Sequence, residues 1–121
     1  MVSNTRFPKL VRLRKKAEFD RVFTGGVWAR NQIVRIAGYR NQDHVTRLGL
    51  VVSRRVGNAI ARNRWKRLIR EAFRLAFSEL PNNLDLLVIP IQSNPPPLEA
   101  IRRALVRLAA QIDRRIEGAG R

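Results

Sequence analysis

Cysteine is absent from this chain of 121 residues, histidine occurs once, and acidic residues number only 9. The lack of cysteine excludes disulfides, thiolate nucleophiles and cysteine-ligated zinc sites. His44 lies in a polar stretch and is interpreted as an exposed loop residue. The chain also lacks a glycine-rich phosphate loop ending in GK[ST]. Because an active site needs an acid, a base, a nucleophile or a metal, we predict a protein with no catalytic site of its own.

Long apolar runs are missing as well. No run approaches the roughly 18 residues that a membrane-spanning helix needs, and the first 25 residues contain no long apolar segment typical of a secretory signal. Together with the lack of cysteine, this favours a cytoplasmic protein. We expect neither a membrane partner nor a small-molecule substrate.

The few carboxylates do not form a pair suited to acid–base catalysis. Glu18 and Asp20 are too close in sequence to share a helix face, and basic residues surround them, so we interpret both as partners in local ion pairs. Asp85 stands alone at the start of an apolar segment and is interpreted as isolated.

Positive charge is what the chain has in excess. It carries 25 Lys and Arg, a formal net charge of +16, and only four of the 25 are lysines. Apolar residues make up 45% of the chain, which is enough for a folded core. We therefore expect a single domain over residues 1–121 that binds a polyanion, most simply a nucleic acid.

Apolar periodicity predicts the elements. We expect helices at about 15–24, 58–78 and from 98 onward, and strands at 27–39, 45–53 and 84–89. The polar residues 40–43 are interpreted as a hairpin loop that joins the first two strands. The ends, 1–14 and 118–121, are expected to be flexible.

The central helix has two unlike faces. Near Trp65 the pattern places an apolar stripe that must face the core, namely Leu68, Ile69, Ala72, Phe73 and Ala76. The opposite side carries Asn63, Arg67, Arg70 and Arg74, with Lys66 beside them and Arg62 and Arg64 at the helix start. Glu71 is the only acid between residues 56 and 77. Like charges one turn apart destabilise a free helix, so a face with one sign of charge favours anion binding over simple solvation.

These residues resemble a known family, the bacterial ribonuclease P protein component. The resemblance is carried by an RNR block, Arg62-Asn63-Arg64-Trp65-Lys66-Arg67-Leu68-Ile69-Arg70-Glu71-Ala72-Phe73. The preceding segment 47–60 is also similar, as are Arg12-Leu13, Glu18-Phe19 and Val22-Phe23. The similarity covers roughly residues 6–90. One departure is Arg35-Ile36, where relatives often carry an aromatic residue.

The resemblance implies an α+β fold, a single-domain α/β sandwich of order αβββαβα whose four-stranded sheet is packed with helices. It also implies different roles for an RNA subunit and the protein subunit. The RNA subunit of ribonuclease P, with bound Mg²⁺, would cleave precursor tRNA, and the protein would bind that RNA subunit and the single-stranded 5′ leader. Residues 27–29 would form a short first strand. Phe19 would line a cleft between the first helix and the sheet, and the cleft would hold the leader.

Helix pattern and resemblance together give a set of predicted RNA-binding residues and no catalytic or metal-binding residue. The predicted set is Arg12, Phe19, Phe23, Arg54, Arg55, Arg62, Asn63, Arg64, Lys66, Arg67, Arg70 and Arg74. Two other functions share the composition. A ribosomal or other structural RNA-binding protein would lack only the RNR block, and a DNA-binding architectural protein would need base-reading residues on its helix.

Overall fold

The computed structural model describes residues 11–119 and follows the predicted order αβββαβα. The elements are α1 (Lys16–Gly25), β1 (Val27–Arg30), β2 (Val34–Arg40), β3 (Arg47–Leu50), the 3-10 turn η2 (Arg54–Val56), α2 (Ala59–Ala76), the 3-10 turn η3 (Phe77–Glu79), β4 (Leu84–Pro90) and α3 (Leu98–Ala119). The α+β class is confirmed. The segment expected as one strand over 27–39 is two strands, of which β1 is the short first strand that the family resemblance implies.

The strand order in the sheet is β1-β2-β4-β3. β1 pairs antiparallel with β2, and β2 pairs antiparallel with β4, whereas β3 and β4 are parallel and are joined through α2. The hairpin predicted around residues 40–43 is therefore wrong, because β4 lies between β2 and β3. The physical reason is that all seven residues of β4 are buried, so this strand needs a central place with cover on both faces.

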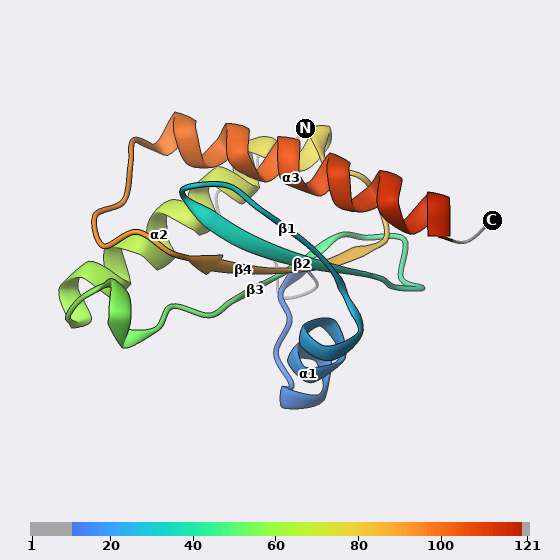
Figure 1. Ribbon diagram of the computed structural model, residues 1–121, viewed down its shortest axis with the longest axis horizontal. Coiled ribbons are helices and arrows are strands. Elements are labelled where there is room, and N and C mark those ends of the chain that lie inside the picture. The colour runs from blue at the N-terminus through green and yellow to red at the C-terminus, as the bar shows by residue number, and fades with distance from the viewer. Residues whose placement is uncertain (1–10, 120–121) are drawn as a thin grey trace, which may run out of the picture.

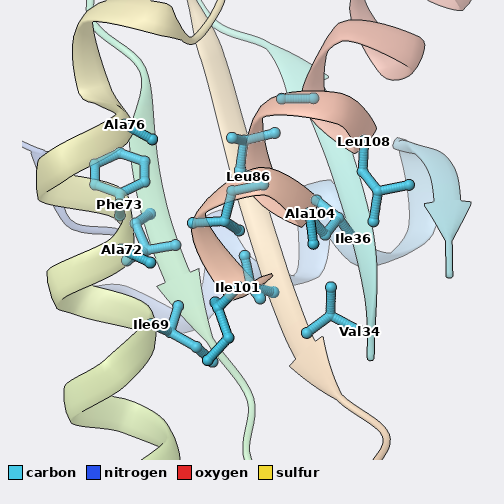
Figure 2. Packing of buried hydrophobic residues seen from close by; sticks show 14 of the residues in the cluster. Val34, Ile36, Ile69, Ala72, Phe73, Ala76, Leu86, Ile101, Ala104 and Leu108 are labelled. Atoms are coloured by element: carbon cyan, nitrogen blue, oxygen red, sulfur yellow. The ribbon is translucent and has the colours of Figure 1, made fainter. Parts of the chain in front are cut away.

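The sheet separates two layers of helices. α2 and α3 pack side by side on one face, and α1 lies against the other (Figure 1). The larger core fills the space between the sheet and the α2–α3 pair, where Ile69, Phe73, Leu86, Ile101 and Leu108 are almost fully buried (Figure 2). A smaller apolar cluster lies under α1.

α2 forms where the sequence predicts it. Asn58 caps the helix, since its side-chain oxygen accepts a hydrogen bond of 3.0 Å from the Ala61 N–H. Gly57, just before the cap, has a φ of 141°, which a residue with a side chain rarely adopts. Trp65 is fully buried, and its indole N–H donates to the Gln92 carbonyl at 3.0 Å. Leu68, predicted as core, is only partly buried at the margin of the cluster.

The ends of the described chain are held by the fold. Val11 and Leu13 are buried, and Arg12 forms an isolated parallel bridge with Leu48 of β3. At the other end α3 continues through Ala119. Residues 11–14 thus lie beside β3, and residues 118 and 119 belong to α3, while the flexibility predicted for 1–14 and 118–121 stays a prediction. Residues 1–10 and 120–121 lie outside the described residues.

Candidate nucleic-acid interface

The outer face of α2 is a row of cations beside an open groove. Arg67 and Arg70 are exposed, and Arg74 follows one turn later. The groove has a volume of about 600 Å³ and is lined by Asn63, Lys66, Arg67, Leu68, Arg70, Glu71 and Arg74. We call the four cations of this groove (Lys66, Arg67, Arg70 and Arg74) the α2 row. The structure thus brings together five of the predicted residues, and Leu68 forms part of their surface.

One carboxylate moderates this charge. Glu71 accepts a hydrogen bond of 3.1 Å from Nε of Arg74, and this contact lowers the pKa of Glu71. Among the described residues, no carboxylate lies within 4 Å of the other three cations of the α2 row. Their charges are therefore available to phosphate groups.

Phe19 of α1 lies over β3 at a glycine. A Cβ atom added to Gly49 would lie 2.9 Å from Cε2 of Phe19 and 2.8 Å from Cδ1 of Leu13. Only a residue without a side chain allows the aromatic ring to approach the strand so closely. Phe19 is partly buried and packs against the smaller cluster, so the ring helps to hold α1 against the sheet while part of it stays exposed.

A second groove, of about 270 Å³, connects this aromatic ring with α2. Its lining residues are Arg12, Leu13, Arg14, Phe19, Leu48, Leu50 and Arg70. Arg70 belongs to both grooves, so the α2 row continues into the cleft beside α1. The two grooves therefore form a continuous path from the cations of α2 to an aromatic ring.

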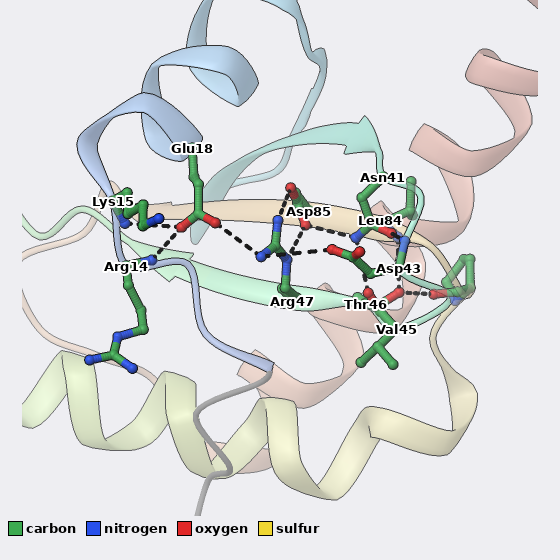
Figure 3. Close-up of polar contacts among 11 residues, drawn as sticks. Arg14, Lys15, Glu18, Asn41, Asp43, Val45, Thr46, Arg47, Leu84 and Asp85 are labelled. Carbon is green, nitrogen blue, oxygen red and sulfur yellow. Dashed lines mark hydrogen bonds and ion pairs between the residues drawn. The ribbon is translucent and has the colours of Figure 1, made fainter.

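α1 is fixed in place by a buried polar network (Figure 3). Arg47 of β3 donates from Nε and Nη2 to the two carboxylate oxygens of Asp85, both at 2.8 Å, and from Nη1 to Glu18 of α1 at 3.1 Å. Asp85 is fully buried and also accepts from Asn41 at 2.8 Å. The interpretation of Asp85 as isolated is wrong. Asp20 does pair locally, with Lys16 at 2.6 Å, but the ion-pair partner of Glu18 is 29 residues away.

The network favours the charged forms of Glu18 and Arg47. Backbone N–H groups of Lys15 and Arg14 donate to Glu18 and, with Arg47, lower its pKa. The hydrogen bonds to Asp85 raise the pKa of Arg47. Because the folded-state pKa of Glu18 is depressed, its contribution to stability is complete at neutral pH and is lost as the pH falls through that pKa.

Not every predicted residue joins these grooves. Arg54 and Arg55 are exposed on η2, and Phe23, 52% exposed on α1, lines neither groove. Arg62 and Arg64 lie near the start of α2, outside the groove lining. The sequence analysis missed Arg14 and Arg47. The signal for Arg14 was its place close to another arginine, Arg12. The signal for Arg47 was Asp85, a lone acid in an otherwise apolar strand, because a buried carboxylate requires a partner.

The described residues contain no group of three or more His, Cys, Asp or Glu side chains arranged to hold a metal ion. Over residues 11–119 there is also no helix with the length and hydropathy needed to cross a membrane. The two grooves are lined by cations, one aromatic ring, apolar side chains, Asn63 and Glu71.

This surface agrees with the similarity of the whole chain to known proteins. The sequence model of the family described as Ribonuclease P matches residues 7–113. The chain belongs to this family. The match decides in favour of a ribonuclease P protein and against the ribosomal and DNA-binding alternatives.

Similar sequences and solved structures agree with this family assignment. The ribonuclease P protein component of Brevibacillus brevis is 39% identical over 99 residues, which are 80% of this chain and 79% of the relative. That of Clostridium kluyveri is 41% identical over 80 residues, 64% of this chain and 71% of the relative. The RNase P protein of Thermotoga maritima superposes with a TM-score of 0.72 at 30% identity, covering 80% of this chain and 96% of the other. A mutant of the Staphylococcus aureus RNase P protein gives a TM-score of 0.75 at 30% identity, covering 85% and 88%.

As a member of this family, the chain is a subunit of an endoribonuclease that processes tRNA, and the name that its relatives share, ribonuclease P protein component, implies an RNA partner. The fold is that of the solved RNase P proteins, with three helices and a four-stranded mixed sheet over residues 11–119.

Proposed function

We propose that this chain binds the RNA subunit of ribonuclease P through the outer face of α2 and holds the 5′ leader of precursor tRNA in the cleft beside α1. The observation that carries the proposal is the sharing of Arg70 between the two grooves. It makes one surface out of a row of cations and an aromatic cleft.

The α2 row suits the phosphate backbone of a folded RNA. Its cations recur at helical spacings, about 5–6 Å between neighbouring side chains. Arginine forks bind phosphate oxygens in pairs, and such contacts position a protein on RNA without reading its sequence. This is the behaviour expected of a subunit that must hold one structured RNA firmly.

The cleft suits a single strand of variable sequence. Base–aromatic stacking is nearly independent of base identity, because every base has a flat face. Phe19 offers such a ring, and Arg12 and Arg70 at the same groove offer charge to the neighbouring phosphates. A leader whose sequence differs from one tRNA to the next can bind in this way.

The phosphodiester is cleaved in this proposal by the RNA subunit and its Mg²⁺, and the protein contributes binding and charge neutralisation. Its place of action is then the cytoplasm. We expect the isolated protein, rigorously free of RNA, to leave precursor tRNA intact. Addition of a ribonuclease P RNA and Mg²⁺ should release 5′-mature tRNA, as seen on a denaturing gel. Cleavage by the RNA-free protein would contradict the proposal.

Replacement of Phe19 tests the cleft. Phe19→Leu keeps most of the apolar volume but removes the stacking surface, so it should weaken binding of precursor tRNA by the holoenzyme by about tenfold. Binding of mature tRNA should change little. Phe19→Ala should do the same and also lower the melting temperature, because the ring packs against the smaller cluster. Equal losses for both tRNAs with Phe19→Leu would assign the ring a packing role alone.

A further inference from the structure

A second row of arginines lies on the outer side of α3, the helix that packs on the sheet face opposite α1 (Figure 1). The exposed residues Arg103, Arg107 and Arg114 form this row, which we call the α3 row. Each of them stands two residues after a fully buried residue of α3, and therefore about 200° around the helix from it. These buried residues are Ile101, Leu105 and Ile112. The α3 row thus points away from the sheet into solvent over a length of about 16 Å.

The charge of the α3 row is hardly compensated within the protein. In the described part of the chain no carboxylate lies within 4 Å of the guanidinium of Arg107 or Arg114, and Arg103 approaches Glu99 only to 3.7 Å. The two acids in the C-terminal half of α3 pair instead with Arg40 of β2, both at 2.9 Å. Because like charges one turn apart destabilise a helix, a bound anion would relieve the repulsion between Arg103 and Arg107.

A cluster of ion pairs separates the α3 row from the α2 row. Arg102 lies about 100° around α3 from Arg103 and on the side of the helix that faces the end of α2. Its guanidinium pairs with Glu79 of η3 at 2.6 Å and with Glu99 at 2.7 Å. This cluster has two carboxylates for one arginine, so it repels a phosphate backbone. An RNA that lies on the α2 row therefore has no favourable path across the cluster to α3.

The surface around the α3 row suits a phosphate backbone better than other partners. Arg103 and Arg107 line a groove of about 450 Å³, whose wall includes the small residues Ala100 and Ala104. In the described chain, the exposed large apolar side chains all belong to elements other than α3. The outer face of α3 thus offers no apolar anchor for a protein or a membrane. It also offers no aromatic ring for unpaired bases, whereas double-stranded RNA is recognised mainly through its backbone and shape.

We propose that the α3 row binds the phosphate backbone of a second RNA helix, which belongs to an RNA other than the ribonuclease P RNA. The proposal rests on the proposed function, since it takes the α2 row to hold the ribonuclease P RNA. Arginine forks match phosphate oxygens, and the cations of one helix face recur at spacings of about 5–6 Å. The holoenzyme then has two separate RNA-binding faces, and the second can retain a structured transcript by its helical parts.

The test titrates a labelled, blunt-ended RNA duplex of about 16 base pairs with holoenzyme assembled at saturating ribonuclease P RNA. The RNA subunit alone gives the background. Arg107→Ala combined with Arg114→Ala should weaken duplex binding about tenfold near 0.1 M salt and lower the salt slope by about 0.7–0.9 per arginine. The same variant should change the affinity for ribonuclease P RNA much less than Arg67→Ala combined with Arg70→Ala.

Two further variants control for charge and for folding. Gln111→Glu places a carboxylate four residues after Arg107 and three before Arg114, so it should weaken duplex binding about threefold without removing an arginine. Arg21→Ala combined with Arg35→Ala removes the same charge as the α3 double variant, but from α1 and from a side chain over Trp28 in the cluster under α1. This control should bind the duplex nearly as wild type does. Melting temperatures within a few degrees of wild type show that each variant keeps the fold.

The outcomes separate this proposal from the proposed function. The α3 site is overturned if wild-type holoenzyme binds the duplex no better than the RNA subunit alone, or if the α3 and control double variants lose equal affinity. It is also overturned if the α3 variant loses ribonuclease P RNA as strongly as the Arg67/Arg70 variant, because both rows then hold the same RNA. Binding to phosphatidylglycerol vesicles in place of the duplex would assign the row to a membrane instead. If the Arg67/Arg70 variant keeps full affinity for ribonuclease P RNA, the proposed function of α2 fails, and the assignment of two separate RNAs fails with it.

Discussion

Replacing Asp85 by alanine is expected to destabilise the protein by about 3–5 kcal/mol, since it leaves the guanidinium of Arg47 largely buried without its main counter-charge. The side chain of Arg47 is only 15% exposed, and two of its hydrogen bonds end on Asp85. Urea unfolding followed by circular dichroism would measure the change. A loss under about 1 kcal/mol would contradict this account of the network.

Two further variants sharpen this test. Asp20→Ala removes a carboxylate of the same type from an exposed pair with Lys16, so it should cost no more than about 0.5 kcal/mol. Combining Asp85→Leu with Arg47→Met replaces the buried charges by apolar groups and should recover much of the stability lost in Asp85→Ala. Glu18 would then lose its partner on β3, so α1 should exchange its amide protons faster even in the rescued protein.

Removing two cations from the α2 row should weaken RNA binding strongly. For Arg67→Ala combined with Arg70→Ala we expect affinity for a ribonuclease P RNA to fall about 25- to 100-fold near 0.1 M salt, because each phosphate contact releases condensed counterions. The slope of log affinity against log salt should decrease by about 0.7–0.9 for each arginine. Filter binding or fluorescence anisotropy at several salt concentrations would measure both quantities.

A matched pair on α3 controls for net charge. Arg107 and Arg114 are exposed and belong to the layer of helices that also contains α2. Replacing both by alanine removes the same charge, yet should reduce affinity and slope much less. The melting temperature of the Arg67/Arg70 variant should stay within a few degrees of wild type, since both side chains are exposed. If the two double variants had equal effects, α2 would contribute to RNA binding only through the net charge of the protein.

The parts of the fold that follow from local pattern could be predicted from the sequence. α2 was predictable because its apolar positions repeat with the helical period and Asn58 supplies a cap. The position of β4 in the sheet could not be predicted in this way. Whether β2 pairs with β3 or with β4 depends on which strand can be covered on both faces. Nothing between residues 40 and 47 encodes that choice.

The candidate site likewise has a part that could be predicted from the sequence and a part that could not. The α2 row was predictable from charge and spacing on one helix. The contact of Arg47 with Asp85 spans 38 residues and needs the β3–β4 register, which no short-range pattern gives. Phe19 was placed beside the sheet by family resemblance, and the reason it fits there, the bare backbone of Gly49, becomes visible only in three dimensions.

One of the two inner strands of the sheet, β4, is the last strand of the described chain. During synthesis the ribosome therefore releases β1, β2, β3 and α2 before the strand that must join them. Until β4 emerges, β2 keeps an unpaired edge, β3 has no partner strand, and the apolar face of α2 has no completed sheet to cover it. Chains that end before Leu84 should thus remain unfolded, and the sheet should assemble only when nearly the whole protein has been made.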